Sequence, residues 1–268
     1  MATWTLDEPD KLAFDGVDRV LVEIVEGAVD VVGTDDQPSL EVSELLGQPL
    51  RVRHEGGALS VDYERPWRIG PLAWFGRGRR TAVLSLAVPH DCRVELHTVS
   101  AGVMVGGLRA PVLVKSVSGE ITLAGLGGRA DAETTSGAVQ ASGVTGDLWA
   151  RTVSGDLTVA EGGGGSVRAR TVSGAVAVDL LASGERDIQL ESVSGDLTVR
   201  LPGTSDLQVK LQSTSGQVAS AFDELELDRT PGRHAARGRL GTGSGRLRAT
   251  STSGHVALLR RAPEPETG

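Results

Sequence analysis

Three carboxylates, Glu120, Asp156 and Asp196, occupy one position of a recurring motif and are the first side chains to consider for catalysis. Hydrolysis of a glycoside uses two carboxyl groups roughly 5–10 Å apart in a shaped cleft. Glu120 and Asp156 are separated by two copies of the motif, and no segment between them is suited to form a cleft. We therefore predict a solvated row of carboxylates and a protein that is not an enzyme.

The other chemically capable residues also lack the neighbours that a reaction or a metal ion requires. Cys92 is the single cysteine, so no intrachain disulfide is expected. The glycine run 162–165 lacks the lysine of a phosphate-binding loop. We predict no catalytic residue, no metal site and no cofactor. The five histidines, none of them at metal-ligand spacing, are His54, His90, His97, His234 and His255.

The strongest candidate for binding is segment 63–81, YERPWRIGPLAWFGRGRRT, which holds half of the eight aromatic residues together with five arginines. Such a segment can bind an anionic membrane surface or an acidic protein partner. Alternatively, it can plug an open side or end of the fold, with its arginines solvated at the rim. The candidate interaction residues are Trp67, Arg68, Trp74, Phe75, Arg77, Arg79 and Arg80.

The elements that must position these side chains are set by a repeat centred on a Ser-Gly pair. The pair recurs at intervals of 18, 18, 19, 21, 21 and 38 residues. A period near 18 residues is too short for a helical-hairpin repeat and fits one coil of a β-solenoid. The pairs are Ser118-Gly119, Ser136-Gly137, Ser154-Gly155, Ser173-Gly174, Ser194-Gly195, Ser215-Gly216 and Ser253-Gly254.

Apolar and polar residues alternate on both sides of each pair. In the copy LWARTVSGDLTV, Leu148 and Ala150 precede the glycine, and Leu157 and Val159 follow it. Period-two alternation buries one face of each strand. The apolar phase flips between the two strands, so a corner is expected at the pair, with glycine at φ > 0. The corner hydroxyls, such as that of Thr152, are expected to hydrogen-bond to the corner backbone.

These patterns predict an all-β fold, a single-stack parallel β-solenoid of about ten coils, right-handed as parallel crossovers generally are. Residues 1–92 are expected to form divergent N-terminal coils with the aromatic/basic loop 63–81. Residues 93–261 are expected to form the regular solenoid. We expect a protruding insertion at 221–245 and a disordered tail at 262–268.

Two features concern the ends of the array. The segments around Gly27 and Gly57 carry apolar residues at the offsets of the repeat, so we expect the first two coils there. At the C-terminal end the array gives way to Arg260, Arg261 and the tail, with no evident capping element. An uncapped end exposes backbone groups with which a second copy can pair.

The net charge and the N-terminal sequence indicate which partners and which cellular location to expect. The net charge of -8 and the pI near 5.2 argue against non-specific binding of nucleic acid. The start, MATWTLDEPDK, has neither a basic n-region nor an apolar h-region, and no apolar run approaches 18 residues. We expect a cytoplasmic location, with attachment to the inner membrane as an open alternative.

The motifs TVSGDLTV, SVSGEITL, SVSGDLTV and STSGHVAL resemble the bacterial β-strand-repeat family named domain of unknown function 4097, often labelled putative adhesin. The opening VEIVEGAVDVVGTDD is similar to the usual first coil of that family, so the likeness spans Val20 to Leu259. The resemblance implies a β-solenoid without established enzymatic activity and a link to the cell envelope. Bactofilins, cytoskeletal β-helices that polymerise end to end, are similar in architecture only.

Two functions follow as expectations. The first is a non-enzymatic scaffold or binding protein, envelope-associated on the cytoplasmic side, that binds a protein partner or an anionic membrane surface. The alternative is a self-assembling cytoskeletal-type polymer built end to end through the solenoid ends. Nucleic acid is not an expected partner.

Overall fold

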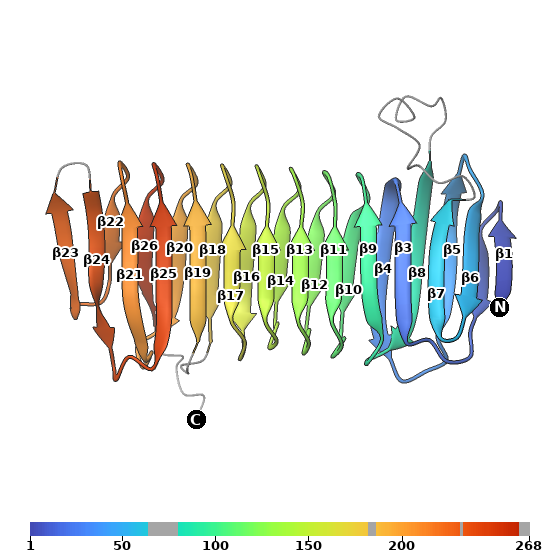
Figure 1. The fold of residues 1–268 in the computed structure, drawn as a ribbon, viewed down its shortest axis with the longest axis horizontal. Coiled ribbons are helices and arrows are strands. Elements are labelled where there is room, and N and C mark those ends of the chain that lie inside the picture. The colour runs from blue at the N-terminus through green and yellow to red at the C-terminus, as the bar shows by residue number, and fades with distance from the viewer. Residues whose placement is uncertain (64–79, 182–185, 231–232, 263–268) are drawn as a thin grey trace. The chain divides into compact units, whose positions relative to one another are not determined.

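The computed structural model describes residues 1–63, 80–181, 186–230 and 233–262 of the 268-residue chain. These residues form strands β1 to β26 and no helix (Figure 1). Accordingly, no described helix is long and apolar enough to cross a membrane. The chain divides into two compact units, residues 1–132 and 133–268, and strand β13 (Ala130–Glu133) spans the division. All but the first residue of the predicted disordered tail, 262–268, lies outside the described residues.

Unit 1 consists of two mostly parallel β-sheets, A and B, that enclose an aliphatic core. In sheet order, the strands of sheet A are β1 (Ala2–Leu6), β6 (Leu50–Glu55), β7 (Ala58–Tyr63), β3 (Arg19–Ile24), β9 (Arg93–Thr98) and β11 (Val112–Lys115). The strands of sheet B are β2 (Asp10–Ala13), β5 (Ser39–Leu46), β8 (Thr81–Pro89), β4 (Glu26–Thr34), β10 (Gly102–Gly106) and β12 (Ile121–Ala124).

Unit 2 has the same two-sheet construction. In sheet order, the strands of sheet A are β15 (Leu148–Arg151), β17 (Val167–Arg170), β19 (Asp187–Ser192), β25 (Gly245–Ser251), β21 (Leu207–Ser213), β24 (Arg233–Leu240) and β23 (Leu225–Thr230). The strands of sheet B are β14 (Val139–Ser142), β16 (Leu157–Gly162), β18 (Val176–Leu180), β20 (Leu197–Pro202), β26 (Val256–Arg261) and β22 (Val218–Ser220).

The alternation in the sequence gives these strands their buried face. Leu148 and Ala150 of β15 and Leu157 and Val159 of β16 are buried, while Trp149 between the first two is half-buried on the outward face. Each buried leucine or valine contributes about 1.5–3 kcal/mol relative to an exposed one. The predicted all-β solenoid is confirmed, with a core of aliphatic side chains between the two sheets.

Parallel pairing aligns equivalent residues of successive coils. Leu157 of β16 pairs with Val176 of β18, and Val159 pairs with Val178. Aliphatic side chains therefore stack on aliphatic side chains along the core. A slip of one residue would turn this whole set toward solvent, so burial fixes the register.

The corner glycines are required for a reason that differs from the predicted one. The glycines of the Ser-Gly pairs are not among the described glycines with positive φ, so the expectation of φ > 0 there is wrong. A Cβ on Gly155 would instead overlap the carbonyl group of Gly137 in the neighbouring coil, only 2.6 Å from its carbon. Glycine is needed because the backbones of adjacent coils approach closely. Positive φ occurs at the second corner, at Gly107, Gly125 and Gly143.

The predicted hydroxyl bonding at the corners is confirmed. Thr152 Oγ1 accepts a hydrogen bond from the Gly155 amide at 3.0 Å and lies 3.5 Å from the Gly137 carbonyl oxygen, to which it donates. Ser154 Oγ donates to the Thr135 carbonyl oxygen of the neighbouring coil at 3.4 Å. The serine and threonine side chains therefore join coils and have no nucleophilic arrangement.

The predicted coil at Gly57 is wrong. Strands β6 and β7 form an antiparallel hairpin within sheet A, with Val52 opposite Val61. The turn contains Gly56 and Gly57 at φ 55° and 82°. Two adjacent residues with positive φ make the tight turn of a hairpin. The next strand along the chain, β8, belongs to sheet B.

The C-terminal region also differs from expectation. Much of segment 221–245, predicted to protrude, forms the antiparallel hairpin of β23 and β24, which continues sheet A with β24 antiparallel to β21. The last coil, β25 and β26, lies between the coils of β19/β20 and β21/β22. The predicted lack of a cap is therefore corrected as well, because a hairpin covers the free edge of β21.

Candidate functional site

Most of the predicted interaction segment lies outside the described residues, and Arg80 is the only one of its candidate interaction residues that can be placed. Its guanidinium carbon is 6.0 Å from the ring centroid of Tyr63, and its carbonyl oxygen accepts a hydrogen bond from the Tyr63 hydroxyl at 2.8 Å. Burial raises the pKa of Tyr63 to about 12, so the phenol stays protonated as a donor. Tyr63 and Arg80 thus fix the two flanks of the segment. The residues outside the description are Trp67, Arg68, Trp74, Phe75, Arg77 and Arg79.

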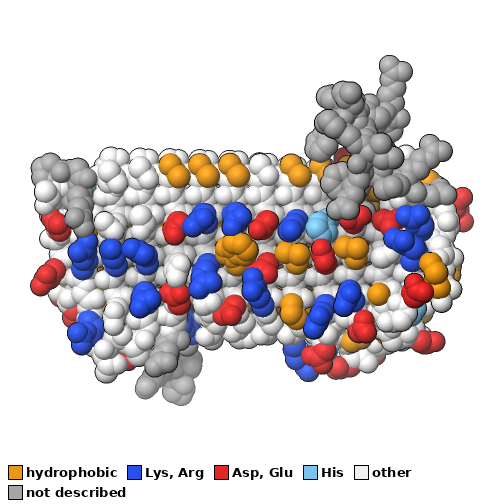
Figure 2. Space-filling view, in the orientation of Figure 1, with side chains coloured by type: hydrophobic (Ala, Val, Ile, Leu, Met, Phe, Trp, Pro, Cys, Tyr) orange, Lys and Arg blue, Asp and Glu red, His pale blue; other side chains and the backbone are white. Residues whose placement is uncertain are grey.

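A second group of cations, which the sequence analysis missed, gathers on the outward face of sheet A in unit 2. Figure 2 shows lysine and arginine side chains together over β24, β21 and β25. They line an open hollow of about 640 Å³ between the outer two of these strands. We call this hollow the basic furrow. Its outward-facing residues are Arg246 and Arg248 of β25, Gln208 and Lys210 of β21, and Arg237 and Arg239 of β24.

Alternation and register together build the furrow. On β25, Leu247 is fully buried, so Arg246 and Arg248 on either side of it are exposed. Arg246 pairs with Gln208 of β21, which in turn pairs with Arg239 of β24.

The second row of the furrow follows the same register. Arg248 pairs with Lys210, and Lys210 pairs with Arg237. Neighbouring strands are roughly 4.8 Å apart, so the arginines of β25 and β24 stand about 10 Å apart across the furrow. Alternate residues on one strand are about 7 Å apart along it. Four arginines therefore form two walls, with Gln208 and the half-buried Lys210 as the floor.

A carboxylate holds the turn that brings the two walls together. Asp206 Oδ2 accepts a hydrogen bond from Thr242 Oγ1 at 2.7 Å, and Oδ1 accepts from the amides of Gly243 and Ser244. The hydrogen bond from Thr242, followed by those from the amides, lowers the pKa of Asp206. Because Asp206 immediately precedes β21, these bonds tie the β24–β25 turn to the floor strand.

The arginines of the furrow are not neutralised by the described part of the chain. The guanidinium groups of Arg237, Arg239, Arg246 and Arg248 form no ion pair or hydrogen bond with any described residue, and all four side chains are exposed. This leaves four fixed positive charges on one small area of a protein whose net charge is -8.

The neighbouring strands show why these arginines lack partners. Asp187 of β19 lies beside Arg246 in the register, but its Oδ2 accepts from Gln189 at 2.7 Å and lies 3.5 Å from Arg168 of β17. The Glu191 carboxylate of β19 likewise pairs with an arginine of β17, Arg170. The Glu191 carboxylate is therefore directed to β17, whereas Asp187 is shared between Gln189, Arg168 and a smaller hollow that adjoins the furrow.

The furrow can attract and hydrogen-bond anions, and its lining contains no carboxylate, histidine, cysteine or hydroxyl side chain. Each arginine presents five N–H donors in a planar fork. No aromatic side chain is among the residues that line the hollow. Within the described ranges, no group of histidine, cysteine and carboxylate side chains could hold a metal ion.

Two of the three carboxylates considered for catalysis, Asp156 and Asp196, bond to the backbone. Asp156 Oδ1 accepts a hydrogen bond from the Ala175 amide of the neighbouring coil at 2.8 Å, and Asp196 Oδ1 accepts from the His255 amide at 2.7 Å. Each carboxylate thus bonds to the equivalent position of the next coil in the stack.

The signal for the furrow was present in the sequence. Arginines recur with period two in ARGRL, at 237 and 239, and in GRLRA, at 246 and 248. Period two means that both arginines of each segment share one strand face. Because segment 221–245 was expected to form a protruding loop, ARGRL was not expected to be a strand. The sequence therefore did not predict that ARGRL and GRLRA lie close together in one sheet.

Comparisons with known proteins give a family and distant structural neighbours. No curated protein matches the chain in sequence. A "putative adhesin" from Bacteroides fragilis shares 9% identity, with 97% of each chain covered and a TM-score of 0.47. A "putative lipid binding protein" from Parabacteroides distasonis shares 12% identity, covering 96% of this chain and 98% of that chain, with a TM-score of 0.36. Likenesses this distant transfer no ligand to this chain.

The sequence profile of Toastrack DUF4097 matches residues 23–259, nearly the span over which the repeat motifs resemble that family. The match covers most of the chain and agrees with the two-sheet solenoid of both units. The chain belongs to the Toastrack DUF4097 family.

Proposed function

We propose that this protein is a non-enzymatic binding scaffold whose basic furrow binds an anionic macromolecule. The observation that carries the proposal is the set of four exposed arginines without ion pairs to described residues. Two unit charges about 7 Å apart repel by about 0.6 kcal/mol in water. An anionic ligand that lies between the walls removes this repulsion and replaces it with charge-assisted hydrogen bonds.

The solenoid suits this role because it holds the walls at fixed separation. The floor strand β21 is paired on both sides, by β25 and by β24, over its whole length. The Asp206 bonds fix the turn that joins the walls. A ligand therefore meets a preorganised surface and loses less free energy to ordering the protein on binding.

The expectations about location and assembly extend this proposal. Association with the envelope on the cytoplasmic side stays a proposal, and segment 63–81 is its candidate for a second contact. The alternative, an end-to-end polymer, is less favoured because β23, which follows β24 in sheet A, exposes Glu226 and Asp228. Charged side chains on an edge strand oppose pairing with another copy.

The test compares two variants of equal net charge. The furrow variant carries Arg237→Gln, Arg239→Gln, Arg246→Gln and Arg248→Gln. The control variant carries glutamine at four arginines that have carboxylate partners. These are Arg129 with Asp131, Arg151 with Glu133, Arg200 with Asp179, and Arg260 with Glu224.

We expect the wild type and the control variant to be retained on a sulfated polysaccharide matrix and to elute with salt, because screening weakens exposed charge interactions. The furrow variant should pass through the matrix while keeping the thermal unfolding of the wild type. Equal retention of the two variants would remove the furrow from the function.

A further inference from the structure

We propose that the furrow binds one extended strand of an anionic polysaccharide, lying along the strand direction between the arginine walls. This inference rests on the proposed function and names the chemical class of its ligand. The partner is identified by three features of the furrow, which are its shape, the character of its lining and the polar group on its floor.

The shape favours a single chain over a flat surface. A second hollow of about 340 Å³ shares Gln208 and Arg246 with the first, and its other lining residues are Arg186, Asp187, Ser244 and Gly245. The first hollow, between the two arginine walls, is a trough that follows the strand direction, whereas the second extends across β25 toward β19. The walls of the trough stand about 10 Å apart, which is the width of one polymer chain with its side groups. A planar membrane surface cannot enter such a trough.

The lining excludes two common anionic partners. Proteins that bind single-stranded nucleic acid stack bases on aromatic side chains, and none lines either hollow. Segments that enter a membrane interface present exposed apolar side chains, whereas Val209 and Leu247 of the lining are 4% and 0% exposed. The lining can therefore hold a ligand by charge attraction combined with hydrogen bonding.

The floor of the furrow also carries a hydrogen-bond acceptor, for which a ligand with anionic groups alone has no donor. The Gln208 side chain donates from Nε2 to the Gly243 carbonyl oxygen at 3.3 Å. Its Oε1 receives no hydrogen bond from the described residues. An acceptor among cationic donors suits a ligand that carries hydroxyl groups as well as acidic groups. A sulfated or carboxylated polysaccharide supplies both on one chain.

The position of the walls sets the length of the ligand. Each wall carries two arginines about 7 Å apart, so acidic groups on successive sugars can alternate between β25 and β24. We expect the affinity to rise with chain length until the oligosaccharide spans the trough and then to level off. A single small anion can reach only part of this array.

The experiment measures fluorescence anisotropy of a labelled, heparin-derived sulfated hexasaccharide with the full-length protein. Parallel arms use the disaccharide, inorganic sulfate, a ten-nucleotide polyuridylate and vesicles of phosphatidylglycerol. The furrow variant tests the walls. Gln208→Leu tests the floor, with Gln212→Leu as its matched control, because Gln212 lies on the same strand but outside the lining.

We expect the hexasaccharide to bind, the disaccharide to bind at least tenfold more weakly, and the furrow variant to lose about 100-fold in affinity. Gln208→Leu should lose about fivefold, and Gln212→Leu should match the wild type. Binding of inorganic sulfate as tight as that of the hexasaccharide would overturn the extended-chain ligand.

The remaining outcomes separate the two proposals. If polyuridylate or vesicles bind through the four arginines and the hexasaccharide does not, the polysaccharide is wrong and the anion-binding scaffold stands. If none of the probes depends on these arginines, both proposals fail. If Gln208→Leu and Gln212→Leu both match the wild type, the role assigned to the floor is wrong.

Discussion

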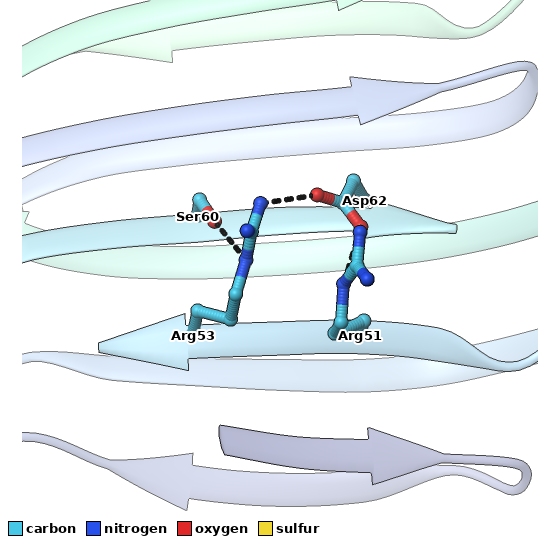
Figure 3. A network of polar contacts seen from close by, with 4 residues as sticks. All are labelled: Arg51, Arg53, Ser60 and Asp62. Atoms are coloured by element: carbon cyan, nitrogen blue, oxygen red, sulfur yellow. Dashed lines mark hydrogen bonds and ion pairs between the residues drawn. The ribbon is translucent and has the colours of Figure 1, made fainter. Parts of the chain in front are cut away.

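Two strands in this protein, each with an antiparallel neighbour, carry arginines at alternate positions. They differ in whether those arginines have a partner on the facing strand. In the β6–β7 hairpin of unit 1, Asp62 accepts hydrogen bonds from Arg51 at 2.8 Å and from Arg53 at 2.7 Å (Figure 3). Arg53 also donates to Ser60 at 3.2 Å. Every arginine of this hairpin network therefore has a partner on the facing strand.

The β24 strand of unit 2 faces a different neighbour. Opposite Arg237 and Arg239 on β21 stand Lys210 and Gln208, neither of which neutralises an arginine. On the other side, Glu226 of β23 is opposite Arg237 in the register, yet the two form no ion pair.

The difference shows that the facing strand, and not the arginine pattern, decides whether the arginines are paired within the fold. Arg51 and Arg53 are used within the hairpin, whereas Arg237 and Arg239 remain available to a ligand. The same alternation LRVR and RGRL occurs in both strands. Only the register, which places Asp62 or Lys210 opposite, separates the two.

The largest effect is expected from a substitution that disturbs the coil carrying the floor of the furrow. Gly216→Ala would place a Cβ 2.5 Å from the carbonyl carbon of Gly254, at the corner where the β21 coil stacks on the β25 coil. Overpacking of this kind costs about 1–3 kcal/mol. Urea unfolding should show this loss, together with loss of anion binding.

Gly102→Ala is the matched control for the corner substitution, because no atom lies within 4 Å of the added Cβ and φ there is not positive. It should change the free energy of unfolding by less than about 0.5 kcal/mol. Equal destabilisation by the two substitutions would show that close approach is not the reason for glycine at the corner.

The next largest effect is expected from a substitution in the β6–β7 hairpin. Asp62→Asn leaves Arg51 and Arg53 without their shared carboxylate and should lower the free energy of unfolding by about 1–2 kcal/mol. Glu226→Gln on β23 should change it by less than about 0.5 kcal/mol, since Glu226 pairs with no arginine whose side chain the structure describes. Chemical denaturation of both variants checks the contrast, and a larger loss from Glu226→Gln would contradict it.

The smallest effect on stability is expected from a substitution that gives the furrow arginines a carboxylate partner, as the hairpin arginines have. Gln208→Glu places one carboxylate between Arg246 and Arg239, as Asp62 stands between Arg51 and Arg53. Stability should change by less than about 1 kcal/mol, since the new ion pairs offset the lost hydrogen bond from Gln208 to Gly243, while affinity for a polyanion falls about tenfold because the walls are partly neutralised. Unchanged affinity, measured by anisotropy, would mean that ligand does not enter the furrow.

The solenoid itself could be predicted from the sequence, because alternation alone sets which face is buried. Leu148, Leu157 and their equivalents at each period become core residues, as expected. The coil at Gly57 could not be told from a hairpin by offsets, since both place apolar residues at the same positions. The Gly56-Gly57 pair was the better signal, because adjacent glycines favour a two-residue hairpin turn.

The order of the coils and the furrow could not be predicted in this way. Leu247 of β25 pairs with Ile188 of β19 on one side and with Val209 of β21 on the other. These aliphatic side chains are nearly interchangeable, so nothing in their pattern indicates that the last coil inserts between two earlier ones. The furrow exists only because of that insertion, which brings Arg246 beside Gln208.

The most direct test of the central claim follows the arginine Nε–Hε resonances by NMR while the sulfated hexasaccharide is added. Our account predicts large shifts for Arg237, Arg239, Arg246 and Arg248 and none for Arg51 and Arg53, whose guanidinium groups are held by Asp62. Shifts confined to arginines outside the furrow, or none at saturating ligand, would contradict it.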